Sequence, residues 1–159
     1  MGQAEHPYPG GSVASWVADL HAPDGGRWAT FEQLLAKYPQ TQAIWWELCS
    51  SGDSADLEPE ALANVRDAIA ARAPGLPIYA SASPSFPGPD TLMCTENDGP
   101  ATMQSFVDEL VATDDVEAGP VLTPLTTDEV AEDGCHARTQ GEQVWGQDLV
   151  DAFGLTTPQ

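Results

Sequence analysis

AIWWELC (residues 43–49) is a continuous, mostly apolar run with polar turn residues on both sides. It is too short for a helix and rich in β-forming residues, so it predicts a buried strand. Similar runs predict two more strands, of which the last is weaker: LPIYASA (76–82) and PVLTPL (120–125). Periodic apolar residues and helix-start signals predict helices over 13–20, 28–38, 59–73 and 101–112, and one opening at 139–142. Because strand and helix alternate, we expect an α/β fold with a parallel sheet.

The ends of the expected helices carry recognisable signals. Ser12 is suited to cap the first helix, and Pro39 follows the second. The last helix opens on TQGE (139–142), which has the pattern of a capping box. No repeat and no second composition regime divides the chain, so residues 1–159 are interpreted as a single domain. An α/β sheet ordinarily begins with a central strand, whereas this chain opens on a turn and a helix, so we expect an N-terminally incomplete domain whose first strand is missing.

Composition excludes several classes of function. The chain has 159 residues, 42% of them apolar and five of them Trp, which favours a packed core over disorder. With 25 acidic against 5 basic side chains and a net charge of −20, it lacks the basic patches that nucleic acids and anionic lipids require. No apolar run approaches the length of a membrane span, and the first residues lack a secretory signal. The oligomeric state stays open.

Cysteine usage bears on the compartment. Cys49, Cys94 and Cys135 form no Cys-x-x-Cys pair, and one thiol is left over if two are bridged. All three pairings stay open. An absent front segment that held the first strand, a fourth Cys and a secretion signal would account for the odd number. The protein would then be secreted, and otherwise cytoplasmic.

The segment EDGCH (132–136), just before the last helix, carries the clearest chemistry. Asp133 lies three residues before His136 on an expected loop, so its carboxylate can accept from one imidazole N–H and leave the other nitrogen free as a base. The same spacing also occurs by chance in solvated loops. His6 and His21 have no such carboxylate and are expected at the surface.

With this Asp-His segment placed before the last helix of an α/β pattern, the chain resembles the SGNH, or GDSL, hydrolase family over nearly its whole length. Asp133 to His136 with Gly141 looks like the last block of the family, YPGGS (8–12) like its second, and the strand at 44–48 like the one leading into its third. The resemblance implies a three-layer, flavodoxin-like fold and ester hydrolysis by a Ser nucleophile, without a metal or organic cofactor. His136 would be the base, Asp133 its orienter and Gly11 an oxyanion donor.

Two departures from the family pattern matter. The third block normally carries an Asn that donates to the oxyanion, whereas this chain has CSSG (49–52), in which Ser51 is the nearest substitute. No Gly-Asp-Ser block precedes the second block, so the nucleophile has no counterpart unless Ser12 takes that part. We therefore expect a serine esterase-like domain acting on a small-molecule ester, with its His-Asp part present and its nucleophile block absent. The alternative is a catalytically inactive scaffold of the same type that binds a ligand or partner.

Overall fold

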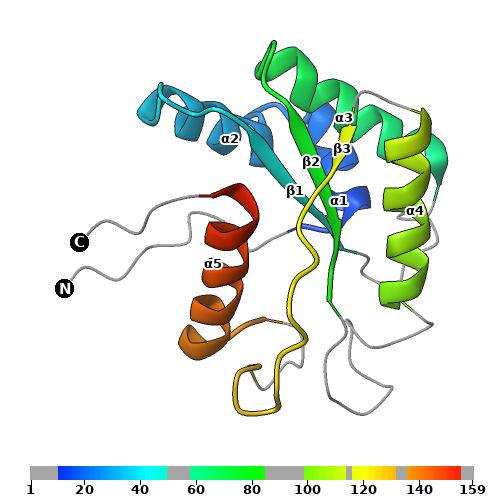
Figure 1. Ribbon diagram of the computed structural model, residues 1–159. Helices are drawn as coiled ribbons and strands as arrows, with labels where there is room; N and C mark the ends of the chain where they lie inside the picture. The colour runs from blue at the N-terminus through cyan, green and yellow to red at the C-terminus, as the bar shows by residue number, and fades with distance from the viewer. Residues whose placement is uncertain (1–10, 50–57, 85–98, 114–115, 132–135, 155–159) are drawn as a thin grey trace.

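The computed structural model of the protein describes residues 11–49, 58–84, 99–113, 116–131 and 136–154. Within these ranges one parallel sheet has the strand order β1-β2-β3, formed by Ile44–Leu48 (β1), Ile78–Ala82 (β2) and Val116–Ala118 (β3). Helices lie on both sides of this sheet (Figure 1). The expected α/β class with a parallel sheet is therefore confirmed. A strand in front of β1 stays a prediction.

The helices begin and end close to their sequence signals. They are α1 (Val13–Ala18), the short 3-10 helix η1 (Asp19–His21), α2 (Gly26–Lys37), α3 (Pro59–Arg72), α4 (Gly99–Thr113) and α5 (Thr139–Phe153). Ser12 caps α1 as expected, since its side chain accepts from the Ser15 N–H. Pro59 occupies the first turn of α3, where its missing N–H is not needed.

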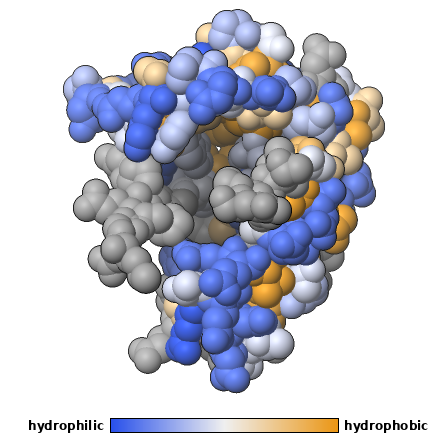
Figure 2. All heavy atoms as spheres, turned by 60° about the vertical axis from the view of Figure 1, so that its left-hand side comes forward, coloured by the Kyte–Doolittle hydropathy of each residue, from blue (hydrophilic) through white to orange (hydrophobic). Residues whose placement is uncertain are grey.

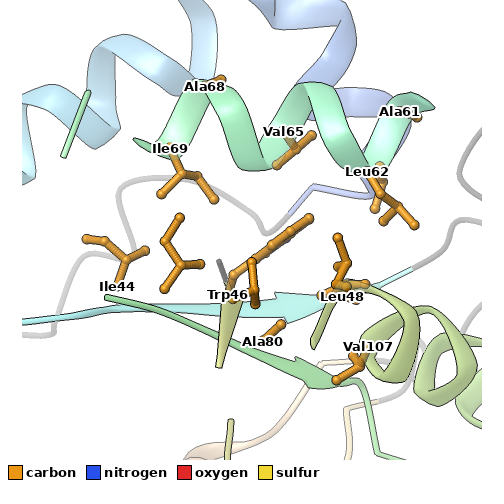
Figure 3. Close-up of a cluster of buried hydrophobic side chains, with 14 of the residues drawn as sticks. Ile44, Trp46, Leu48, Ala61, Leu62, Val65, Ala68, Ile69, Ala80 and Val107 are labelled. Carbon is orange, nitrogen blue, oxygen red and sulfur yellow. The ribbon is translucent and has the colours of Figure 1, made fainter. Parts of the chain in front are cut away.

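The main core lies on the face of the sheet that α3 covers, hereafter the α3 face. Ile44, Trp46 and Leu48 alternate along β1 as its buried residues, and Val65 and Ile69 of α3 point toward them (Figure 3). Buried side chains of α4 join the same cluster: Met103, Val107 and Leu110. Right-handed crossovers that step in one direction along a sheet put successive helices on one side, as observed for α3 and α4. Full burial of a side chain of this size stabilises the fold by about 1.5–3 kcal/mol.

The opposite face, hereafter the α5 face, is more polar and carries fewer described contacts. Trp45, Glu47, Tyr79 and Ser81 alternate with the core residues and are paired across β1 and β2 in register. The ring of Phe153, near the end of α5, meets that of Tyr79 with centroids 5.1 Å apart. Figure 2 shows the side of the molecule on which α2 and α5 come forward: it is mostly hydrophilic and hollowed between its upper and lower parts.

Two sequence-based expectations are wrong in detail. The third strand is not 120–125 but Val116–Ala118, after which the chain leaves the sheet. Pro120 and Pro124 lack the N–H that a ladder needs, although Leu122 and Leu125 are buried as strand residues would be. The capping box does not form either, because the N-cap residue of α5 is Arg138, which makes no side-chain cap bond, and Thr139 is already helical.

Candidate active site at the carboxyl edge of the sheet

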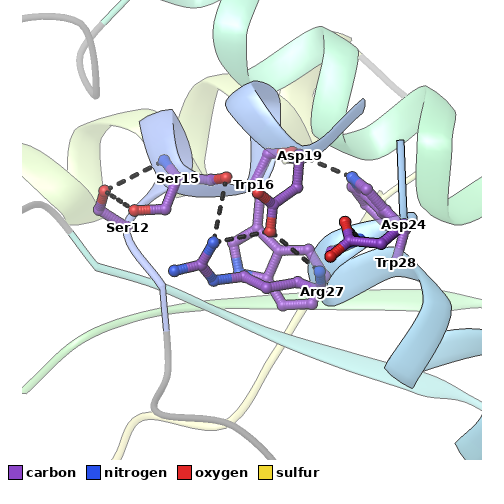
Figure 4. A network of polar contacts seen from close by, with 8 residues as sticks. Ser12, Ser15, Trp16, Asp19, Asp24, Arg27 and Trp28 are labelled. Atoms are coloured by element: carbon purple, nitrogen blue, oxygen red, sulfur yellow. Dashed lines mark hydrogen bonds and ion pairs between the residues drawn. The ribbon is translucent and has the colours of Figure 1, made fainter. Parts of the chain in front are cut away.

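The start of α1 lies against the carboxyl end of β1. The Val13 N–H donates to the Cys49 carbonyl at 3.3 Å, which holds Gly11 and Ser12 at this edge. The Ser12 hydroxyl accepts from the Ser15 N–H at 3.4 Å and lies 3.1 Å from the Ser15 hydroxyl (Figure 4). Ser12 is therefore the N-cap of α1 in this structure. Of the two roles considered from the sequence, helix cap and nucleophile, this is the first.

Gly11, the expected oxyanion donor, packs against the side chain of Arg27. A Cβ at this position would lie 2.5 Å from Arg27 Nε, so any larger residue here would displace the Arg27 side chain. Arg27 in turn donates to Asp19 at 2.7 Å and to the Ser15 carbonyl at 3.4 Å (Figure 4). The Arg27 backbone N–H lowers the pKa of Asp19, burial opposes this, and the Arg27 side chain lowers it further. The position of Arg27 therefore accounts for a glycine at residue 11 without any role in catalysis.

His136 lies in the short antiparallel pairing that leads into α5. The Ala131 N–H donates to the His136 carbonyl at 2.8 Å, the Arg138 N–H donates to the Glu129 carbonyl at 2.7 Å, and Val130 bridges Ala137. The His136 side chain is exposed. Asp133 lies outside the described residues, so its contact with the imidazole stays a prediction. Ser51, the expected second oxyanion donor, lies outside them as well.

The direction of α5 places His136 beyond the carboxyl ends of the strands. The C-terminal Phe153 of α5 meets Tyr79 in the first half of β2, so the helix runs back against the strands and its N-terminus projects past their ends (Figure 1). Ser12 approaches the same edge from the α3 face, because α1 packs on that side. The structure therefore brings Gly11 and Ser12 together at β1 and puts His136 on the α5 side of the edge.

A cavity of about 290 Å³ opens at the carboxyl ends of β2 and β3. Ligands of open α/β sheets collect at this edge. The polar side chains that line the cavity include Ser81, Ser83 and Gln104, and its apolar lining includes Val107 and Leu122. Sequence reasoning missed this cavity, because its walls come from β2, α4 and the segment after β3, and no local pattern joins them.

Ser81 holds one wall of the cavity in place. Its hydroxyl accepts from Trp45 Nε1 at 3.0 Å and donates to the Pro120 carbonyl at 2.7 Å. The Gly119 N–H donates to the Ala80 carbonyl at 2.7 Å, and any side chain at Gly119 would collide with the Ser81 hydroxyl. The Ser81 hydroxyl therefore links β2 both to Trp45 of β1 and to the chain after β3.

Glu47 is the unusual side chain of β1. It lies in an otherwise apolar strand, and burial raises the pKa of its carboxyl above the ordinary value, while a hydrogen bond from the Ser83 hydroxyl partly opposes this rise. The Ser83 N–H also donates to the Leu48 carbonyl at 3.0 Å, so Ser83 continues the pairing of β2 with β1. A carboxylate in an apolar strand is the one signal by which the sequence could have pointed to this pair.

Comparisons with models of protein families, with curated proteins and with solved structures find no match to this chain. Within the described ranges, no three His, Cys, Asp or Glu side chains gather as a metal site would require. None of the helices described is both long and apolar enough to cross a membrane.

Proposed function

We propose that this protein is an ester hydrolase of the SGNH type that acts on small, uncharged esters. His136 serves as general base, Asp133 orients it, and Gly11 and Ser51 donate to the developing oxyanion. The observation that carries the proposal is the shared position of α1 and of the His136 segment at the carboxyl edge of a parallel sheet. The net charge of −20 disfavours anionic substrates.

Hydrolysis of a short p-nitrophenyl ester tests the proposal. His136→Ala is expected to lower kcat by at least about 100-fold, the usual contribution of a positioned general base. His21→Ala is the matched control, because His21 is also exposed but lies in η1 at the far end of α1 from Ser12. Equal activity of the two variants, or a folded wild-type protein without turnover, would contradict the proposal.

The second candidate is a non-catalytic scaffold of the same type. The engagement of the Ser12 hydroxyl with Ser15 favours it, because a nucleophile of that kind needs its hydroxyl paired with a base. A folded protein that neither hydrolyses the ester nor reacts with a fluorophosphonate would support this candidate over the first.

A further inference from the structure

Ser83 is placed as a reactive hydroxyl would need to be. It follows β2 directly, and its backbone N–H donates to the Leu48 carbonyl at 3.0 Å, so it lies beside the carboxyl end of β1. Because side chains alternate along a strand, Ser83 shares the α5 face with Ser81 and Glu47. In the parallel register Glu47 lies opposite Ser81, two residues before Ser83, and the Ser83 side chain partly offsets the rise that burial causes in the pKa of the Glu47 carboxyl. A serine hydroxyl next to a base is the arrangement that activates a nucleophile.

The contrast with Ser81 shows why Ser83 is the reactive candidate of the two. The Ser81 hydroxyl accepts from Trp45 and donates to Pro120, and Ser81 is only 3% exposed. Ser83 is more exposed and has the carboxyl group of Glu47 as its side-chain partner. Among the described residues, no cation forms an ion pair with Glu47.

The cavity supplies what else an acyl-transfer site requires. Gln104 of α4 also lines it, and the Gln104 Nε2 donates one of its two N–H groups to Asp108 at 2.9 Å. The second N–H is left for an oxyanion, the part that an Asn amide has in the family pattern. Val107 and Leu122 give an apolar lining. At about 290 Å³ the cavity is at the small end of ligand sites, which suits a short acyl group.

We propose that Ser83 is the nucleophile of this protein and that it forms an acyl-enzyme with short-chain, uncharged esters in this cavity, with Glu47 as its proton acceptor and Gln104 as an oxyanion donor. The inference rests on the ester hydrolysis proposed above and assigns its nucleophile to a residue of the described chain.

The proton transfers are divided between Glu47 and His136. The Ser83 Oγ forms a bond to the acyl carbon while its proton passes to the Glu47 carboxylate. The bond from the acyl carbon to the alkoxide then breaks, and Glu47 returns the proton to the leaving alcohol. In the second half His136 takes a proton from water, the hydroxide displaces Ser83 from the acyl carbon, and that proton restores the Ser83 hydroxyl. The products are an alcohol and a carboxylic acid.

Fluorophosphonate labelling tests the first half of the reaction by itself. The full chain is reacted with the probe, digested, and the modified residue is identified by mass spectrometry. We expect the label on Ser83. Ser83→Ala is expected to abolish the labelling, and Glu47→Gln to slow it by about 100-fold. Ser105 and Glu109 are exposed residues of α4, so Ser105→Ala and Glu109→Gln serve as matched controls and are labelled as the wild type is.

The outcomes separate this inference from the proposed function. A label on Ser12 or another residue, or unchanged labelling in Ser83→Ala, overturns the assignment of Ser83 even where His136→Ala still abolishes ester turnover. A label on Ser83 with turnover insensitive to His136→Ala supports Ser83 and removes the base from the proposed function. Absence of both label and turnover overturns both. Because the label is mapped on the wild-type protein, misfolding of a variant does not obscure the result.

Discussion

Two glycines of helix α5 make the packing of the His136 segment measurable. A Cβ at Gly141 would lie 2.6 Å from the Glu129 carbonyl oxygen and 2.7 Å from Leu125 Cδ1, whereas a Cβ at Gly146 would meet no atom within 4 Å. Both glycines are helical, so alanine at either gains about 1 kcal/mol of helix propensity. Gly146→Ala is therefore expected to stabilise the protein by about 1 kcal/mol.

At Gly141 the gain in propensity is outweighed. Overpacking a close contact costs about 1–3 kcal/mol, and the upper value applies because the Glu129 carbonyl is backbone and already accepts the Arg138 N–H. The expected net loss for Gly141→Ala is about 2 kcal/mol, so the two variants differ by about 3 kcal/mol.

Urea unfolding followed by circular dichroism, supported by thermal melts, measures this difference. For a domain of this size 1 kcal/mol shifts Tm by about 2–4 °C, so Gly146→Ala should melt above the wild type and Gly141→Ala well below it. Equal stabilisation by the two alanines would refute the reasoning. It would show that α5 does not pack on the 125–129 segment and that the placement of His136 is incorrect.

Three further predictions concern the sheet and its carboxyl edge. Ser81→Ala leaves the Trp45 N–H and the Pro120 carbonyl without their partner, and is expected to cost about 1–3 kcal/mol in urea unfolding. Glu47→Gln is expected to flatten the pH dependence of stability. Since burial raises the folded pKa of Glu47, the protonated group stabilises the fold below its unfolded pKa, and this stabilisation is lost as pH rises through the folded value. Unfolding free energies that fall equally in both proteins from pH 4 to pH 8 would contradict this. Ser12→Ala is expected to cost about 0.5–1 kcal/mol, the low end for an N-cap because the bond is long at 3.4 Å, and to raise hydrogen exchange in α1 without abolishing ester turnover.

Elements with strong apolar patterns were predictable from the sequence. The stripe of α4 and the existence of strand β1 are as expected, because each buries a set of side chains against the same core, although only alternate residues of β1 are buried. The third strand was misplaced for a physical reason. Leu122 and Leu125 are buried by packing outside the sheet, whereas two of the three residues of β3 are exposed, so the stronger apolar signal lies in the wrong segment.

The site was less predictable than the fold. The position of Ser12 as a cap follows from local chemistry, and the sequence predicted it. The Glu47 and Ser83 pair depends on the register of β1 against β2, in which Glu47 lies opposite Ser81. Register between strands more than thirty residues apart is set by long-range packing, so no window of the sequence contains it.

Glu47 raises a question that stability alone does not answer. The neighbouring positions of β1 are Trp46 and Leu48, and a neutral side chain at Glu47 would avoid the desolvation of a carboxylate that has a hydroxyl rather than a cation as its partner. Groups that burden the fold in this way concentrate at functional sites, where a base needs a raised pKa in order to accept a proton. The same change, Glu47→Gln, should therefore make the protein more stable near neutral pH and less reactive toward the fluorophosphonate. A structural carboxyl would lose stability on this change, and a surface carboxyl would alter neither property.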